Sequence, residues 1–171
     1  MHHARTTTTA LLEGLLDPQA QQSWTEFDQR FRPILRGFAM KLGLNDADAE
    51  DVTQEALVRF VKYYRQGKYD RTRGRLSSWL ISITQHCISD LRQAKAGRFE
   101  RRGESAIINL SDTDALGLLW EEECRRVLLD HAMDELRQNS RLDEKTIRAF
   151  ELVSLEQRAA AEVATETGIS L

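Results

Sequence analysis

Hydrophobic residues recur at steps of three and four along most of this chain, which is the spacing of a helix with one buried face. The first such stripe consists of Trp24, Phe27, Phe31, Ile34, Leu35, Phe38 and Leu42. Ser23 and Glu26 have the spacing of a capping box, so this helix is predicted to begin at Ser23 and to stop at Gly43. Pro33 lacks an amide hydrogen and predicts a kink or break within the helix.

Two more helices with the same period are predicted to follow. The second begins after Asn45, whose side chain can cap it, and runs to about Tyr64, before Gly67. Its buried stripe is Ala49, Val52, Ala56, Phe60 and Tyr64. The third covers about 77–95, and its inner stripe is Leu76, Leu80, Ile83, Cys87 and Leu91. Residues 1–22 contain a threonine tract and a short apolar patch at 11–16, and they are predicted to be a flexible leader.

A second set of helices is predicted beyond residues 97–117, a segment of little periodicity that is interpreted as a linker. These helices cover about 118–139, 143–155 and 159–167. Residues 162–170 have the pattern of the first half of a helix-turn-helix, in which Gly168 supplies the turn and Ser170 can cap a following helix. The sequence thus predicts an all-α fold with helical modules at 23–96 and 118–171.

Composition agrees with a helical protein, since the 171 residues include only two prolines and nine glycines. No apolar run approaches the ~18 residues of a membrane span, and the N-terminus lacks the pattern of a secretion signal. Cys87 and Cys124 form no metal-binding pattern and are interpreted as reduced thiols in a cytoplasm. His2 and His3 are interpreted as tail, and no nucleotide-binding, hydrolase or metal motif favours an enzyme or a cofactor.

The net charge of −3 hides a strong asymmetry along the chain. Residues 1–58 carry five Lys/Arg against nine Asp/Glu, residues 59–102 carry 12 against three, and residues 103–171 carry seven against 15. The middle block therefore has a net charge of +9, between flanks of −4 and −8. Such a basic block is typical of a surface that binds a polyanion, although solvated helices also alternate in charge by chance.

Three groups of polar residues carry candidate chemistry. One face of the second helix presents Asp48, Asp51, Gln54 and Glu55. The loop that follows holds, around the single acid Asp70, the cations Lys68, Arg71, Arg73 and Arg75. The outer face of the third helix is polar but nearly uncharged and includes Gln85 and His86. Cations that hold phosphates, beside neutral groups that address base edges, favour a nucleic-acid reader.

Two segments resemble the sigma-70 family of bacterial RNA polymerase initiation factors, in particular the small two-domain extracytoplasmic-function (ECF) type. The first segment is DAEDVTQEALVRF at 48–60, which is similar to the AED-x-x-QE helix of the family. The second is GRLSSWLISI at 74–83, followed by DLR at 90–92, which resembles the G-x-F-x-x-WL-x-x-I segment of the family. The resemblance covers roughly residues 24–171 and is most specific in 45–95.

The resemblance implies a sigma factor that binds core RNA polymerase and directs promoter recognition and melting at the −10 element. The residues that would contact the clamp of the core polymerase are Asp48, Asp51, Gln54 and Glu55. Those that would contact the non-template DNA strand are Lys68, Arg71, Arg73, Arg75, Gln85 and His86. In this interpretation the arginine-rich loop captures a flipped base, and an anti-sigma factor is a further partner.

The chain departs from the family pattern at three places. Leu76 replaces the usual Phe, and His86 stands where Asn is usual, so the preferred −10 sequence is expected to differ. The second module lacks the recognition helix that would bind the −35 element. Either the sequence is a fragment, which is the expectation, or −35 binding is absent. Trp79 is expected in the core, and Asp90 and Arg92 are expected to form a local structural pair.

Two other functions stay open from the sequence. The chain is alternatively a helical protein-interaction module whose acidic second part engages an anti-sigma-type partner. It is alternatively a simple helix-turn-helix DNA-binding regulator, although that function gives the acidic face of the second helix no purpose. Promoter-dependent transcription by core polymerase would distinguish both from a sigma factor.

Overall fold

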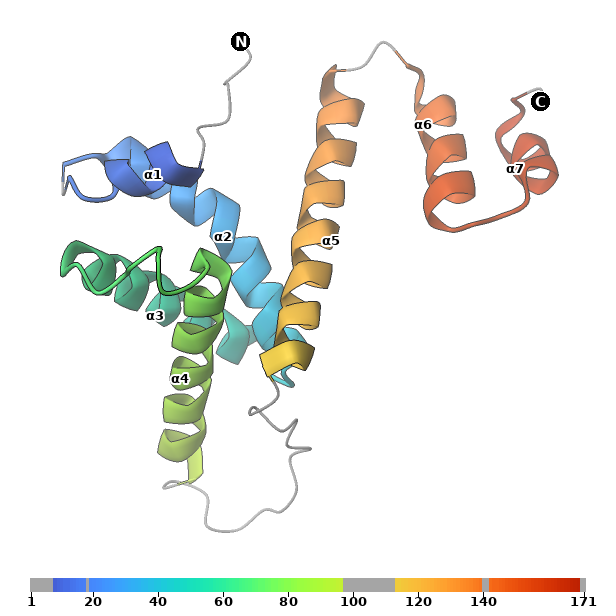
Figure 1. Ribbon diagram of the computed structural model, residues 1–171. Coiled ribbons are helices and arrows are strands. Elements are labelled where there is room, and N and C mark those ends of the chain that lie inside the picture. Colours follow the sequence, from blue (N-terminus) through green and yellow to red (C-terminus); the bar gives the residue numbers. More distant parts are fainter. Residues whose placement is uncertain (1–7, 18, 97–112, 140–141, 170–171) are drawn as a thin grey trace. The chain divides into compact units, whose positions relative to one another are not determined.

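The computed structural model describes residues 8–17, 19–96, 113–139 and 142–169, and every regular element within these ranges is a helix (Figure 1). The helices are α1 (Thr8–Gly14), α2 (Gln21–Lys41), α3 (Asp46–Arg65), α4 (Leu76–Ala96), α5 (Thr113–Asn139), α6 (Glu144–Phe150), a π-helical turn η1 (Glu151–Leu155) and α7 (Ala160–Thr167). The predicted all-α class is confirmed. The chain divides into two compact units, residues 1–124 and 125–171, which are described separately.

The core of the first unit lies among α2, α3 and α4, with α3 packed against both of the other helices (Figure 1). The predicted stripes supply this core, and its fully buried side chains include Phe27, Leu35, Phe38, Phe60 and Leu80. Phe27 and Phe60 stack across α2 and α3 with ring centroids 4.7 Å apart. Since burial of one large apolar side chain contributes roughly 1.5–3 kcal/mol, these rings account for much of the contact between the two helices.

The predicted ends of α2 and α3 are formed by specific backbone and side-chain contacts. The Asn45 side chain accepts a hydrogen bond from the Asp48 amide at 3.0 Å, which is the predicted N-cap of α3. Gly43 and Gly67 follow the two helices with φ of 90° and 70°, and their amides donate to Met40 and Tyr64. In each case the amide of the residue after the glycine donates to the carbonyl one residue earlier in the helix. Both helices therefore end in a Schellman motif.

The predicted start of α2 is wrong, and of the two outcomes predicted at Pro33, a kink or a break, the break does not occur. The helix begins at Gln21 and not at Ser23, so Ser23 lies in the first turn and caps nothing. A turn closed by the Ala20 amide on the Asp17 carbonyl, at 3.1 Å, brings the chain to the helix two residues early. Pro33 does not break the helix, because only one hydrogen bond is lost in 21 residues whose apolar face stays buried.

Residues 8–14 of the predicted flexible leader form helix α1, which packs on α2. Leu11 and Leu15 are each 1% exposed, and Leu12 is also buried. The Arg65 side chain at the end of α3 donates to the Leu15 carbonyl at 2.9 Å. The short apolar patch therefore belongs to the core of the first unit, since its leucines share one helical face.

Helix α5 begins at Thr113, five residues before its predicted start, and residues 97–112 of the predicted linker lie outside the described residues. Its first turns belong to the first unit, where Trp120 is buried with its ring edge-on to Phe38 at 5.6 Å. Lys41 at the end of α2 pairs with Glu122 at 2.8 Å. The compact units consequently divide inside this helix, after Cys124, and not at the predicted position 118.

The second unit packs α6 against α7 and buries Ile147, Leu152 and Val163. Asp143 caps α6 by accepting from the Thr146 amide at 2.7 Å. Gly168 follows α7 with φ of 71°, which agrees with its predicted place in a turn, whereas Ser170 lies outside the described residues. No helix in the described ranges is long and apolar enough to cross a membrane.

Candidate nucleic-acid interface and acidic helix face

The basic loop, residues 68–75, joins α3 to α4 and is anchored by aromatic rings. Tyr69 in the loop stacks on Trp79 of α4, with centroids 5.0 Å apart and an angle of 21° between the rings. Trp79 in turn packs edge-on against the buried Phe60 at 5.1 Å. Trp79 is half-buried, so it joins the core as expected and also supports the loop. This stack of rings holds the basic loop against the helical core.

Asp70 shapes the turn of the basic loop. Its carboxylate accepts from the Thr72 amide at 2.9 Å and from the Thr72 hydroxyl at 2.6 Å. The Arg73 amide also donates to the Asp70 carbonyl at 3.1 Å, which closes the turn. The hydrogen bonds from Thr72 hold the pKa of Asp70 below its ordinary value. Asp70 therefore stabilises the loop conformation in which Arg71 and Arg73 are exposed.

Replacement of Asp70 separates this conformational role from its charge. Asp70→Ala removes the acceptor for Thr72, and we expect it to weaken binding of single-stranded DNA by about threefold even though a negative charge is lost. Asp70→Asn keeps an acceptor oxygen and also removes the charge, so it is expected to bind at least as tightly as the unaltered chain. Fluorescence anisotropy with a labelled oligonucleotide measures both. Tighter binding by Asp70→Ala than by Asp70→Asn would contradict the conformational role.

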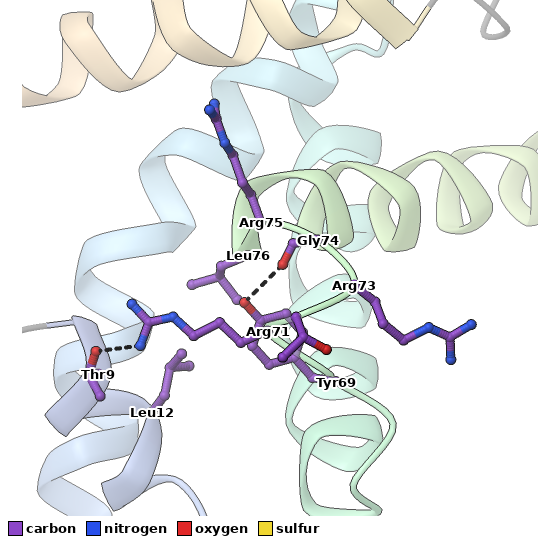
Figure 2. Close-up of a pocket in the computed structure, with 9 residues that line it drawn as sticks. Thr9, Leu12, Tyr69, Arg71, Arg73, Gly74, Arg75 and Leu76 are labelled. Carbon is purple, nitrogen blue, oxygen red and sulfur yellow. Dashed lines mark hydrogen bonds between the residues drawn. The ribbon is translucent and has the colours of Figure 1, made fainter.

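A pocket of about 470 Å³ lies between α1 and the basic loop (Figure 2). Thr9 and Leu12 of α1 line one side, and residues 69 and 71–76 line the other. The Arg71 guanidinium donates to the Thr9 hydroxyl at 3.0 Å, which ties the loop to α1. A second pocket, of about 260 Å³, lies against α4 and is lined by Trp79 and Ser82 among others. Guanidinium groups beside aromatic rings suit a phosphate and a base of single-stranded nucleic acid.

The predicted DNA-contacting residues fall into two groups. Arg73 and Arg75 line both pockets, and Lys68 and Arg71 each line one of them. Gln85 and His86 lie further along α4 and line neither. Figure 2 shows that the side chains of Arg71, Arg73 and Arg75 project in different directions from the loop, so they do not converge on one point. Arg73 and Arg75 are exposed and form no ion pair with another described residue. The loop thus presents separate cations, an arrangement that suits an extended polyanion more than a compact anion.

Several residues that line the two pockets are not among the predicted site residues. Thr9 and Leu12 lie in the predicted leader, Tyr69 carries no predicted role, and Gly74 appears only in the segment that resembles the family. The signal that would have indicated Tyr69 is its place between the cations of the loop, five residues after Tyr64 and ten before Trp79. Its ring centroid lies 6.0 Å from that of Tyr64. Lys68, by contrast, was predicted and packs its ammonium group over the Tyr63 ring at 4.5 Å.

The expected structural pair of Asp90 and Arg92 does not form. Asp90 pairs with Arg59 of α3 at 2.7 Å, and Arg92 donates to the Leu42 carbonyl at 3.0 Å. Residues two apart on a helix point in different directions, which explains why each finds its own partner. Both contacts fix α4 to the rest of the first unit.

The acidic face of α3 is exposed at its centre and paired at its ends. Asp51 is exposed, as are Gln54 and Glu55. Glu55 accepts from Arg59 of the same helix at 2.6 Å. Asp48 is less accessible than these three residues. It pairs with Lys95 of α4 at 2.5 Å, and its side chain is only 19% exposed. Asp51, Gln54 and Glu55 are therefore the part of this face that is open to a partner.

The two cysteines behave as unreactive thiols. Burial raises the pKa of Cys87 to about 11 and also raises the pKa of Cys124 above its ordinary value. A thiol with a raised pKa is little ionised at neutral pH and is a poor nucleophile. No group of three or more His, Cys, Asp or Glu side chains within the described ranges could hold a metal ion. His2 and His3 lie outside these ranges.

A protein-family model matches the part of the chain that carries the basic loop and the acidic face of α3. Residues 27–98 match the model of the sigma-70 region 2 family, and they include most of α2, all of α3 and α4, and the basic loop. This part of the chain is similar to sigma-70 region 2. The resemblance found in the sequence is thereby confirmed for residues 27–98.

One known protein is similar to part of this chain. The chain is 26% identical over 82 residues to the ECF RNA polymerase sigma factor RpoE of Cereibacter sphaeroides. The matched segment covers 48% of this chain and 44% of that protein, so the match spans less than half the length of the relative. No solved structure matches the chain.

Proposed function

We propose that the chain is an RNA polymerase sigma factor of the ECF type, which binds core polymerase and directs recognition and melting of the promoter −10 element. The observation that carries the proposal is that the segment similar to sigma-70 region 2 holds both an open acidic helix face and an anchored basic loop. These two surfaces match the two partners that such a factor must hold together. In this proposal the polymerase performs the chemistry, and the chain itself is neither an enzyme nor a cofactor-binding protein.

The acidic face of α3 is the proposed contact with the clamp of the core polymerase. Asp51, Gln54 and Glu55 supply the contact, and Asp48 belongs to the same face but acts also through its ion pair with Lys95. Carboxylates on an exposed helix attract a cationic surface and set its orientation during association. The clamp would therefore present cations opposite this turn of α3.

The basic loop and the outer face of α4 are the proposed contacts with the non-template strand. Lys68, Arg71, Arg73 and Arg75 would hold phosphates, while Tyr69 offers a ring for stacking. Gln85 and His86 would address bases further along α4. Extrusion of a base costs a few kcal/mol, and the pockets beside the loop would recover part of that cost by enclosing the base. With these partners, the proposed place of action is the cytoplasm.

The proposal is tested by transcription in vitro with core polymerase and a library of promoter sequences. We expect the chain to select promoters with a shared −10 element and to yield transcripts that core polymerase alone does not. Absence of both promoter selection and binding to core polymerase would refute the proposal.

Charge reversal at Asp51 tests the clamp contact. Asp51→Lys is expected to weaken the affinity for core polymerase by about tenfold or more, because it sets a cation against a cationic surface. Competition binding against a labelled sigma factor measures the affinity. The matched control is Glu13→Lys, which makes the same change of charge at an exposed position of α1. An unchanged affinity for Asp51→Lys, or an equal loss for Glu13→Lys, would sink the clamp assignment.

An anti-sigma-type partner is the second candidate, and exposed apolar side chains in the second unit favour it. Leu142, Phe150, Val153 and Leu155 are between 39% and 51% exposed. Exposed apolar side chains that lie close together in the sequence are candidates for a protein contact. Such a partner would regulate the proposed sigma factor. If the chain binds such a partner but does not support promoter-dependent transcription, the interaction module is favoured over the sigma factor.

A further inference from the structure

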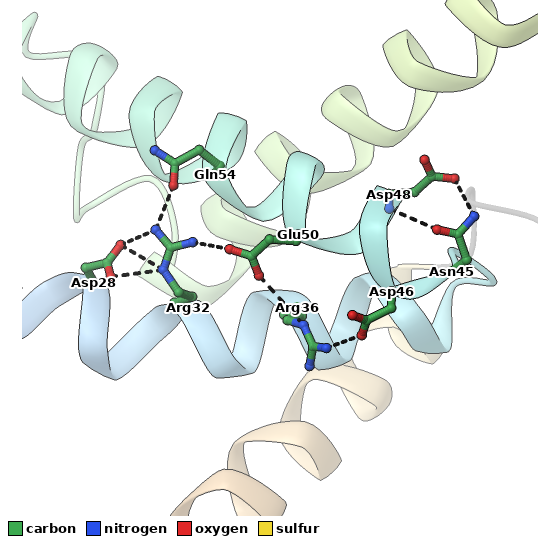
Figure 3. A network of polar contacts seen from close by, with 8 residues as sticks. All are labelled: Asp28, Arg32, Arg36, Asn45, Asp46, Asp48, Glu50 and Gln54. Carbon is green, nitrogen blue, oxygen red and sulfur yellow. Dashed lines mark hydrogen bonds and ion pairs between the residues drawn. The ribbon is translucent and has the colours of Figure 1, made fainter.

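Arg32 of α2 lies under the acidic face of α3 and holds it by several hydrogen bonds (Figure 3). One guanidinium edge binds Asp28 of the same helix, with Nε to Oδ2 at 2.9 Å and Nη2 to Oδ1 at 2.7 Å. Across the helix contact, Nη1 donates to Glu50 at 2.5 Å and Nη2 donates to Gln54 Oε1 at 2.7 Å. The planar guanidinium is thus fixed from three sides, and Gln54 is held to it.

The contact with Arg32 decides which way the Gln54 amide points. A guanidinium only donates hydrogen bonds, so the group that faces Arg32 must be the carbonyl oxygen Oε1. The Nε2 amide group of Gln54 is therefore turned away from Arg32, as Figure 3 shows. Gln54 is exposed, and no described residue accepts a hydrogen bond from this amide group. The exposed group at this position is a fixed pair of N–H donors, on the helix face that also carries Asp51 and Glu55.

We propose that Arg32 is a positioning residue of the polymerase-binding surface, which fixes Gln54 as a hydrogen-bond donor toward the partner. This inference rests on the proposed function. It specifies the chemistry of the partner at this position, which must offer an acceptor, a carboxylate or a carbonyl oxygen, to the Gln54 amide. Without Arg32, the amide would rotate freely, and binding would have to order it.

Arg36, one turn further along α2, is a matched control for Arg32. Its guanidinium pairs with Asp46 and lies 3.7 Å from Glu50, so it also joins α2 to α3. It makes no contact with Gln54 (Figure 3). If arginines on this side of α2 act only by holding the two helices together, the substitutions Arg32→Met and Arg36→Met should have similar effects on binding.

The test is a double-mutant cycle on the full chain, with affinity for core polymerase as the readout. Gln54→Glu keeps an acceptor for Arg32 but loses the outward donor, and Gln54→Met loses both. We expect each to weaken binding by about tenfold. Arg32→Met should weaken binding by about threefold in the native background and have no effect when Gln54 is already Met. Arg36→Met should stay within about twofold of the unaltered chain.

Thermal unfolding of every variant separates binding from stability. A purely structural Arg32 would lower the melting temperature and the affinity alike, whatever residue stands at 54. Unchanged affinity for Gln54→Glu, additive effects of Arg32→Met and Gln54→Met, or an Arg36→Met effect equal to that of Arg32→Met would each overturn the inference. If Asp51→Lys weakens binding in the same assay, such a result leaves the proposed function intact. If Asp51→Lys has no effect, the clamp contact is wrong and the inference falls with it.

Discussion

A chain that carries both Arg71→Ala and Arg75→Ala is expected to bind a single-stranded −10 oligonucleotide about 100-fold more weakly than the unaltered chain. Each arginine would give one charge-assisted hydrogen bond to a phosphate, worth about 1.5 kcal/mol or more, and the two together give about 3 kcal/mol. The slope of log affinity against log salt should become shallower by about 1.4, because each phosphate contact with a single strand contributes about 0.7. Anisotropy titrations at several salt concentrations measure both quantities.

A second double variant tests whether oligonucleotide binding depends on the position of the cations or on the net charge of the chain. Arg125→Ala with Lys145→Ala removes the same charge from two exposed positions outside the basic loop. We expect this variant to change the affinity by less than about twofold and to leave the salt slope unchanged. An equal loss in both double variants would mean that the oligonucleotide responds to the overall charge and not to the loop.

Most of the helical framework could be predicted because it depends on local rules. The apolar stripes of α2, α3 and α4 have the helical period, and their members Phe27, Phe60 and Leu80 are fully buried. Asn45 and Gly43 act within one helical turn of their own position, so the sequence around them is enough to predict what they do. The helix start predicted from the capping box at Ser23 is wrong, because a turn at Asp17 brings the chain into the helix two residues earlier.

The arrangement of the candidate site could be predicted only in part, since it depends on contacts between distant residues. Arg32 meets Gln54 across 22 positions of sequence, and Arg71 meets Thr9 across 62. No periodic pattern connects such pairs; they become neighbours only after α1 and α3 have packed on α2. For the same reason, the basic loop was predicted but the pocket that it forms with α1 was not.

Phe60 joins the core to the basic loop, and Phe60→Ala is expected to lower the free energy of unfolding of the first unit by about 3–5 kcal/mol. The side chain is 0% exposed, and its ring packs on Phe27 at 4.7 Å and on Trp79 at 5.1 Å. Truncation removes buried area and leaves a cavity between α3 and α4 that neighbouring rings cannot fill. Urea unfolding followed by circular dichroism measures the loss.

Val58→Ala is the control, because Val58 lies on the same helix with its side chain 48% exposed and should cost less than about 0.5 kcal/mol. Phe60→Leu keeps most of the buried volume, so it should recover much of the stability but not the edge-on contact with Trp79. Since Trp79 supports Tyr69 in the basic loop, Phe60→Leu is also expected to weaken oligonucleotide binding by about twofold to threefold in a folded protein. Full stability of Phe60→Ala would show that the stacked rings do not hold α3 in place. Unchanged oligonucleotide binding by Phe60→Leu would show that the loop keeps its conformation without them.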